Sequence, residues 1–157
     1  MTEDVTLLHV YLRLNARQKM FFEVSRSVNA SPEKLWSILT DRSRLIEGGF
    51  GIIKLEGDIR PDGKIKIWSE ANPGRAFPLR VSTFSPSSLM VWEGGMPFGL
   101  FKGVRRFAIE KTDNGCRFHM REDYSGPLTG IIGKSIPNLT PSFEKFADAL
   151  KRHAEGA

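Results

Sequence analysis

The stretch LFKGVRRFAIEKTDNGCRFHMREDYSG, residues 100–126, has the pattern of one long β-hairpin. Apolar and polar residues alternate up to Thr112, and the alternation resumes at Cys116, which is typical of two half-buried strands. Between them, Asp113-Asn114-Gly115 predicts a tight turn, because Asn and Gly readily adopt the positive φ angles of short hairpins. A hairpin with one apolar face needs a core to cover it, so we expect the rest of the chain to enclose this one.

The two faces of the predicted hairpin differ in composition. The outer face is solvated, and it carries Lys102, Val104, Arg106, Ala108, Glu110, Arg117, His119, Arg121 and Asp123. The inner face is apolar except at three positions, and it carries Phe101, Gly103, Arg105, Phe107, Ile109, Cys116, Phe118, Met120, Glu122 and Tyr124. A turn centred on Asn114-Gly115 places Arg105 opposite Tyr124, with Glu122 as a diagonal neighbour. Burying these three polar groups costs free energy unless they are paired, so we expect this face to line something.

Length and composition indicate one soluble globular domain. The chain has 157 residues, of which 40% are hydrophobic and 26% charged, as is ordinary for a single domain. Its one cysteine, Cys116, excludes an internal disulfide and favours a reducing, cytoplasmic compartment. No apolar run reaches the roughly 18–20 residues of a membrane span, so we expect no stable membrane insertion. The net charge of +5 is scattered among acidic residues, so we expect no nucleic-acid partner.

Residues 1–19 differ in pattern from the rest of the chain. They lack the apolar segment and cleavage site of a secretory signal, and Met20 opens the first clear strand. We therefore divide the chain into an N-terminal extension, residues 1–19, and a single domain, residues 20–155. One hypothesis is that Met20 is the physiological start.

Short strands and two capped helices precede the hairpin. Phe21–Asn29 is a strand by alternation; Ser31 then predicts the N-cap of one helix, and Asp41 that of a second through Ile46. Four more strands are expected at 51–59, 64–70, 77–81 and 89–93, with turns at 60–63, 72–74 and 85–87. With the first strand and the hairpin they make seven antiparallel strands. The glycine-rich residues 94–99 are expected to form a loop.

The end of the chain changes from a strand period to a helix period. Thr140 predicts an N-cap, and apolar residues then recur at i, i+3, i+4 and i+7, namely Phe143, Phe146, Ala147 and Leu150. The apolar face of this helix needs a large apolar partner, and the concave face of the sheet can provide one.

Four motifs carry a resemblance to a known family: VNASPEKLW at 28–36, PG at 73–74, MVWEG at 90–94 and FADALK at 146–151. In this order and spacing, over about residues 20–155, the chain resembles the SRPBCC superfamily. That group includes START domains, Bet v 1-type proteins, and bacterial polyketide cyclase/dehydrase-like and Hsp90-activator-like proteins. The resemblance implies an α+β helix-grip fold, in which a curved seven-stranded antiparallel sheet wraps around a long C-terminal helix. Two short helices lie between strands 1 and 2, and a cavity separates sheet from helix.

The resemblance implies a ligand site in that cavity, and the inner-face residues supply the candidates. The ligand-binding candidates are Arg26, Trp92, Phe101, Arg105, Phe107, Phe118, Met120, Glu122 and Tyr124, with Arg26 joining if the first strand pairs beside the last. Met96 and Phe98 are candidate gate residues in the glycine-rich loop. Each has a plainer alternative: the aromatics as core, Arg105 and Glu122 as a self-satisfied ion pair, and the loop as a simple connection.

Three functions stay open. The first, which we favour, is non-catalytic binding, with possible transport, of a hydrophobic small molecule or lipid. The second is a polyketide cyclase/dehydratase-like enzyme, in which Glu122 moves a proton and Arg105 or Tyr124 stabilises an enolate-like oxygen. The third is an Hsp90-activator-like interaction module with a filled core.

No cofactor or metal is expected from the sequence. The three histidines, His9, His119 and His153, have no metal-ligand spacing, and no phosphate-binding or dinucleotide motif is present. The sequence predicts a monomer or a homodimer, and it does not identify the ligand.

Overall fold

The structure is a computed structural model that describes residues 20–156. Residues 1–19, with the predicted extension and the hypothesis about Met20, lie outside this range. The elements in chain order are β1 (Met20–Val28), α2 (Pro32–Leu39), α3 (Arg42–Glu47), β2 (Ile52–Gly57), β3 (Lys64–Ser69), β4 (Asn72–Ser85), β5 (Leu89–Gly95), η1 (Pro97–Gly99), β6 (Lys102–Thr112), β7 (Gly115–Ser125), α4 (Thr129–Ile132), η2 (Gly133–Ser135) and α5 (Thr140–Ala154).

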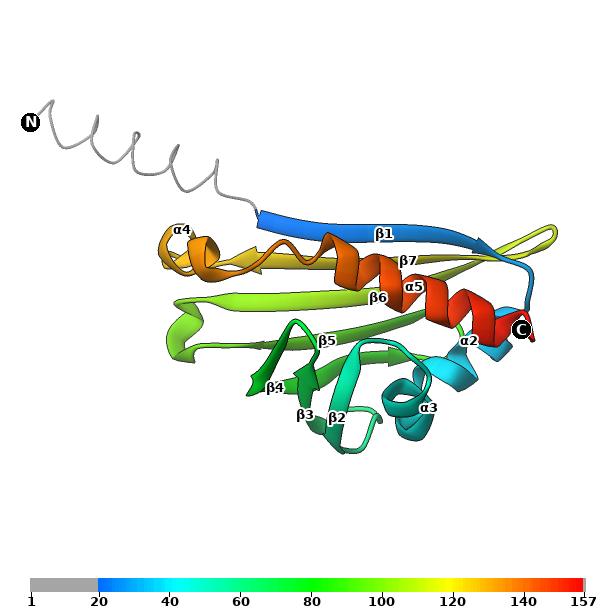
Figure 1. Ribbon diagram of the computed structural model, residues 1–157, viewed down its shortest axis with the longest axis horizontal. Helices are drawn as coiled ribbons and strands as arrows, with labels where there is room; N and C mark the ends of the chain where they lie inside the picture. The colour runs from blue at the N-terminus through cyan, green and yellow to red at the C-terminus, as the bar shows by residue number, and fades with distance from the viewer. Residues whose placement is uncertain (1–19, 157) are drawn as a thin grey trace, which may run out of the picture.

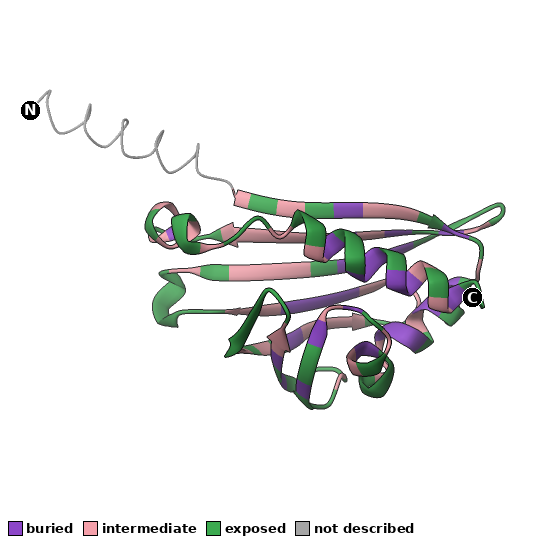
Figure 2. Cartoon of the chain, in the orientation of Figure 1, coloured by how far each residue is buried: buried purple, intermediate pink, exposed green. Residues whose placement is uncertain are grey.

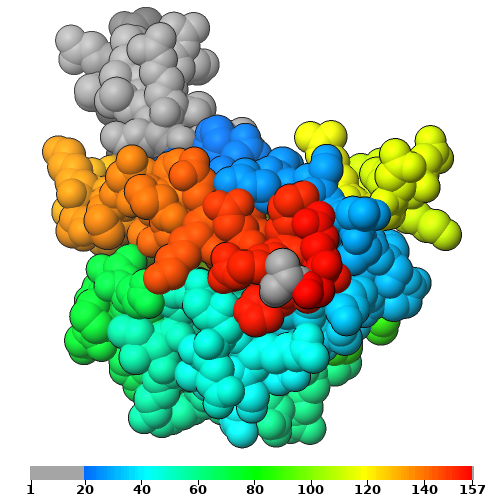
Figure 3. Space-filling view, turned by 45° about the vertical axis from the view of Figure 1, so that its right-hand side comes forward, coloured from blue at the N-terminus to red at the C-terminus, as the bar shows by residue number. Residues whose placement is uncertain are grey.

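The strands form one antiparallel seven-stranded sheet in the order β1-β7-β6-β5-β4-β3-β2, so β1 and β2 lie at its two edges (Figure 1). Helix α5 runs along β1, and α2 and α3 lie at the end of the sheet where α5 finishes. In the space-filling view, α5 in red lies between β1 in blue and α2 in cyan (Figure 3). This arrangement confirms the predicted α+β helix-grip fold, with two short helices between the first two strands.

The core lies between α5 and the sheet, because α5 is amphipathic as its sequence predicts. The buried residues alternate along α5 with exposed ones (Figure 2). The Phe146 ring lies 5.0 Å from that of Phe50, 5.8 Å from that of Phe107 and 6.4 Å from that of Phe118, measured between centroids. Phe146 therefore links the helix to the centre of the sheet. In the described part of the chain, no helix is long and apolar enough to cross a membrane.

Local capping signals predict the short helices correctly. The backbone N–H of Lys34 donates to Ser31 Oγ at 3.1 Å, and that of Arg44 donates to Asp41 Oδ1 at 3.2 Å. Thr140 is the exception, because it is the first residue of α5 and not its N-cap.

The turn predicted at residues 72–74 is wrong. Ser69 pairs with Asn72, so the chain reverses earlier, at residues 70–71, and β4 runs for 14 residues. Pro73 is the second residue of this strand, where proline is tolerated because little of the ladder precedes it.

The hairpin also turns one residue earlier than predicted. Thr112 pairs with Gly115, so Asp113 and Asn114 alone form the turn, and Gly115 begins β7. A Cβ on Gly115 would lie 2.2 Å from the carbonyl oxygen of Val28, so glycine is needed for this close approach to β1. The register consequently shifts by two: Arg105 faces Glu122, and the predicted Arg105–Tyr124 pair is wrong.

Candidate functional site

Arg105 and Glu122 form an ion pair on the concave face of the sheet. They face one another across β6 and β7, and Arg105 Nε donates to Glu122 Oε2 at 2.9 Å. A second guanidinium nitrogen donates to the same oxygen, and the Tyr124 phenol also lies within reach of the carboxylate. The side chains are 19% and 14% exposed respectively, so the pair is mostly buried yet still reachable.

Tyr124 lies two residues beyond Glu122 on the same face, and it stacks on Phe101 with 5.6 Å between ring centroids. Its cross-strand partner is Gly103, where a Cβ would lie 3.3 Å from both Glu122 Oε1 and Tyr124 Cε1. Glycine thus leaves open the space between the carboxylate and the tyrosine ring. Burial raises the pKa of the Tyr124 phenol well above its ordinary value, and the nearby Glu122 carboxylate adds to the rise. The phenol therefore stays protonated and able to donate.

Aromatic rings surround this polar group. The Arg105 guanidinium carbon lies 4.8 Å from the centroid of the Phe143 ring, which belongs to the first turns of α5. The Phe22 ring lies 6.1 Å from that of Phe143 and 6.3 Å from that of Tyr124. The group therefore lies where α5 begins, with an apolar wall beside it.

Trp92 completes the group from the next strand. It faces Arg105 across β5 and β6, and its ring packs 4.7 Å from that of Phe107. Its side chain is buried, and its indole Nε1 finds no hydrogen-bond acceptor among residues 20–156. Burying a donor without a partner costs about 1–3 kcal/mol, so this N–H calls for an acceptor that the described residues do not supply.

The remaining candidates fall into two sets. Phe107, Phe118 and Met120 are fully buried and belong to the hydrophobic core. Arg26 lies on β1 beside β7, as expected, but its Nε donates to Asp148 Oδ1 of α5 at 2.8 Å. The prediction that it joins the Arg105 group is wrong, because α5 lies over this part of β1 and takes the side chain.

The predicted gate residues lie on the surface. Met96 precedes the short turn η1, and Phe98 within it is 99% exposed, so its ring covers none of the Arg105 group in this structure. A gating role stays a prediction.

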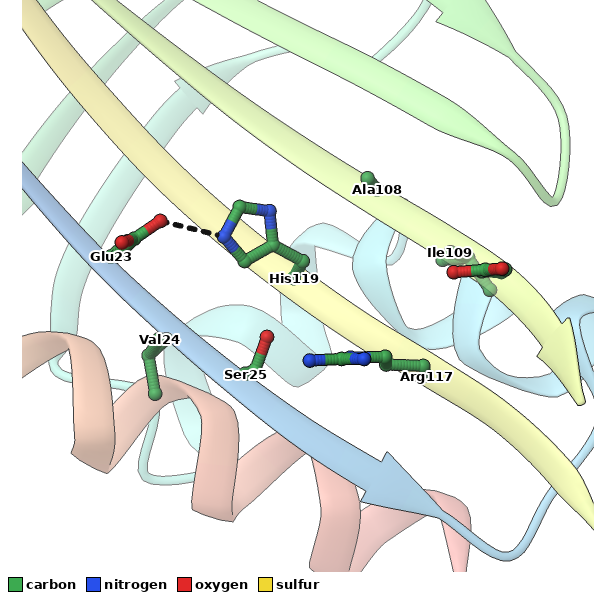
Figure 4. Close-up of a pocket in the computed structure, with 8 residues that line it drawn as sticks. Glu23, Val24, Ser25, Ala108, Ile109, Arg117 and His119 are labelled. Atoms are coloured by element: carbon green, nitrogen blue, oxygen red, sulfur yellow. Dashed lines mark hydrogen bonds and ion pairs between the residues drawn. The ribbon is translucent and has the colours of Figure 1, made fainter.

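Two surface hollows lie away from this group and contain none of the predicted ligand-binding residues. One, of about 590 Å³, lies on the convex face of β1, β6 and β7 (Figure 4) and is lined by Glu23, Val24, Ser25, Ala108, Ile109, Glu110, Arg117 and His119. Within it, His119 Nε2 lies 3.0 Å from Glu23 Oε2. The other, of about 600 Å³, lies at the β6–β7 turn and includes Lys151 and Glu155, which are hydrogen-bonded to each other.

Two other reactive side chains in the described part of the chain, Cys116 and His153, are packed into the fold. Burial raises the pKa of the Cys116 thiol, so it is a poor nucleophile. His153 stacks on Phe50 with 5.4 Å between ring centroids, and its Nε2 lies 2.9 Å from the carbonyl oxygen of Gly48.

Because its pKa is raised, the Tyr124 phenol should not ionise at its ordinary pH in an alkaline titration of the folded protein. The chain has two tyrosines, so the difference between the absorbance titrations of wild type and Tyr124→Phe isolates this phenol. We expect no ionisation near the ordinary value of about 10 while the protein is folded. Because the folded pKa lies above the unfolded one, stability is present below about pH 10 and is lost as the pH rises further. A difference step at the ordinary pH would contradict the burial described here.

Several solved proteins share this fold. The di-domain ARO/CYC StfQ from the steffimycin biosynthetic pathway has a TM-score of 0.70 at 14% identity, covering 92% of this chain and 54% of StfQ. This chain thus spans about half of StfQ. Truncated norcoclaurine synthase from Thalictrum flavum has a TM-score of 0.66 at 14% identity, covering 88% of this chain and 95% of that one. The Zhui aromatase/cyclase from Streptomyces sp. R1128 has a TM-score of 0.67 at 10% identity, covering 87% and 94%.

At these identities the structural likeness shows the fold alone. No functionally curated protein matches the chain. The sequence does match a family described as "Polyketide cyclase / dehydrase and lipid transport", over residues 21–155, which is most of the chain. The SRPBCC-type resemblance is therefore confirmed, and the chain belongs to the polyketide cyclase/dehydrase and lipid transport family.

Proposed function

We propose that this protein binds a hydrophobic small molecule or a lipid on the concave face of the sheet, where α5 begins. The observation that carries the proposal is the buried Trp92 Nε1, which has no acceptor among the described residues and belongs to the residue that faces Arg105 across β5 and β6. A ligand oxygen at this point would accept from the indole and remove its desolvation cost. The family description, which includes lipid transport, agrees with such a ligand.

The surrounding groups define the chemistry of that ligand. Its polar end would meet donors from Trp92 and Arg105, and the Glu122 carboxylate with the Tyr124 phenol beside it. Its apolar body would pack against aromatic rings, namely Phe22, Phe101 and Phe143. A molecule with a carbonyl or hydroxyl oxygen on an aromatic or aliphatic body fits this pattern. In an apolar site, a small number of polar groups typically fixes the orientation of the ligand.

The test removes the indole N–H and keeps the buried ring. Anilinonaphthalene sulfonate is a suitable probe, because it joins an aromatic body to acceptor oxygens, and its fluorescence rises on binding. We expect Trp92→Phe to weaken its affinity about three- to tenfold, the share of one hydrogen bond. Trp36→Phe is the matched control, because Trp36 packs against Phe84 from α2 and should leave affinity unchanged. Equal affinities in the two variants would refute the proposed site.

The second candidate is an enzyme of the cyclase or dehydratase type in the same place. A phenol that stays protonated beside a carboxylate is an acid–base arrangement, and this observation favours it. Glu122 would accept a proton from the carbon next to a ligand carbonyl, while Arg105 and Tyr124 donate to the enolate-like oxygen. The names of the neighbouring aromatase/cyclases agree with such chemistry.

Glu122→Gln separates the two candidates. For an enzyme, losing the base should lower the rate of turnover roughly 10²-fold or more. For a binder of uncharged ligands, the amide keeps an acceptor toward Arg105, and affinity should change little. Turnover would be followed by mass spectrometry of a polyketide-like carbonyl compound incubated with each protein. Undiminished turnover by the variant would exclude Glu122 as the base.

The interaction-module alternative requires a filled and self-satisfied core. The orphaned Trp92 N–H argues against it, because a core that needs no ligand should satisfy its own buried donors.

A further inference from the structure

Four large apolar side chains are exposed together at one end of the molecule. They are Met96, Phe98 and Leu100, around η1, and Ile131 of α4. The two segments are joined, because the backbone N–H of Leu128 donates to the carbonyl oxygen of Leu100 at 3.0 Å. Figure 1 places α4 and the β5–β6 connection at the end opposite to the C-terminus, and Figure 2 shows the β5–β6 connection as exposed. We name these four residues the apolar tip.

The backbone holds the tip outward. Met96 N–H donates to the carbonyl oxygen of Phe101 at 2.8 Å, which closes the loop at its base. At its apex Phe98 has a φ of 60°, a left-handed conformation that is costly for a residue with a side chain. Its ring is 99% exposed, and the Ile131 side chain is 73% exposed. A strained position that holds an aromatic ring in water indicates a surface that meets another apolar phase.

The two segments that carry the tip contain no acidic residue. Residues 94–101 and 126–143 include no aspartate or glutamate, and Lys134 is the one charged residue among them. Lys134 is exposed, and so is Lys102, two residues after Leu100, whose ammonium group lies 3.7 Å from Glu93 Oε2. An apolar apex with Lys134 behind it matches an anionic phospholipid surface, where the apolar side chains enter the interface and the ammonium group meets the headgroups.

We infer that the apolar tip docks this protein on anionic phospholipid bilayers, as a peripheral and reversible contact. The inference does not rest on the proposed ligand site, because none of the four tip residues belongs to it. The two are nevertheless neighbours: Phe101, the residue after the tip, stacks on Tyr124. Docking would therefore turn this end of the sheet, with its polar group, toward the bilayer.

The experiment measures co-sedimentation of the full chain with vesicles at near-physiological salt. We expect binding to vesicles of phosphatidylcholine with phosphatidylglycerol and little binding to phosphatidylcholine alone. Phe98→Ser and Ile131→Ser should each lower the partition coefficient about tenfold, since each removes a large apolar contact with the interface. Lys134→Gln should lower it about fivefold, the share of one lysine near an anionic surface.

Ile53→Ser is the matched control, because Ile53 is a similarly exposed apolar residue on the β2 edge of the sheet. All these side chains are on the surface, so the variants should keep the wild-type unfolding midpoint. The inference is overturned if Phe98→Ser binds anionic vesicles as well as Ile53→Ser does. It is also overturned if the full chain ignores the vesicles and sediments as a dimer that Phe98→Ser dissociates, since the tip would then contact a second copy.

Discussion

Replacing Phe146 with alanine is expected to lower the free energy of unfolding by about 3–5 kcal/mol, the usual cost of removing a buried aromatic ring. The ring is buried and lies within 6.4 Å of three others, which come from β6, β7 and the segment before β2. Its loss leaves a cavity between helix and sheet that the strands cannot close. Urea unfolding followed by far-ultraviolet circular dichroism measures the change.

Glu144→Ala is the matched control for Phe146→Ala. Glu144 lies two residues away on α5 and is exposed, so its removal should change stability by less than about 0.5 kcal/mol. A similar, small effect of both substitutions would contradict the packing of α5 on the sheet.

Replacing Arg105 with methionine is expected to lower the free energy of unfolding by about 2 kcal/mol. Breaking a fully buried ion pair costs about 3–5 kcal/mol, and the cost is smaller here because both side chains keep some exposure. The methionine preserves much of the volume, but Glu122 then faces no guanidinium and keeps its desolvation cost. The same variant should also weaken ligand binding, because a charged donor is lost at the polar end of the site.

The double variant Arg105→Met/Glu122→Gln shows whether the loss of stability comes from the unpaired Glu122 carboxylate or from altered packing of the Arg105 side chain. If the stranded carboxylate is the cause, the double variant should recover more than half of the stability that the single variant loses. Additive losses from the two substitutions would show instead that the two side chains stabilise the fold independently.

Local patterns in the sequence predict most of the fold, because each signal acts within a few residues. The spacing of Phe143, Phe146, Ala147 and Leu150 predicts α5, and Ser31 and Asp41 predict the two capped helices. The face of every hairpin residue is also predicted, because side chains alternate with a period of two.

The partners across strands depend on contacts that are distant in the sequence. A hairpin slip of two residues keeps each side chain on its face but changes its neighbour, so the alternation cannot choose between the two registers. In the structure Thr112 pairs with Gly115, where a Cβ would lie 2.2 Å from the carbonyl oxygen of Val28 on β1, far earlier in the chain. Arg26 follows the same logic: its face is predictable, but its partner Asp148 depends on where α5 lies.

The sequence predicts Trp92 as a site residue, but it does not predict that the indole N–H lacks an acceptor. Its place on a strand next to the hairpin indicates an inward side chain. That its N–H lacks an acceptor depends on every neighbouring group at once, and so only the three-dimensional arrangement reveals it.

Native mass spectrometry of the protein purified from its own host tests the central claim most directly. We expect an added mass at about one per chain, released by organic solvent and identified as an apolar molecule that carries a carbonyl or hydroxyl oxygen. Occupancy should fall in Arg105→Met and in Trp92→Phe, and it should persist in Trp36→Phe. The claim of a ligand at Trp92 and Arg105 would be contradicted by two results together. The purified protein would carry no added mass, and no fraction of the host's lipid extract would change its tryptophan fluorescence.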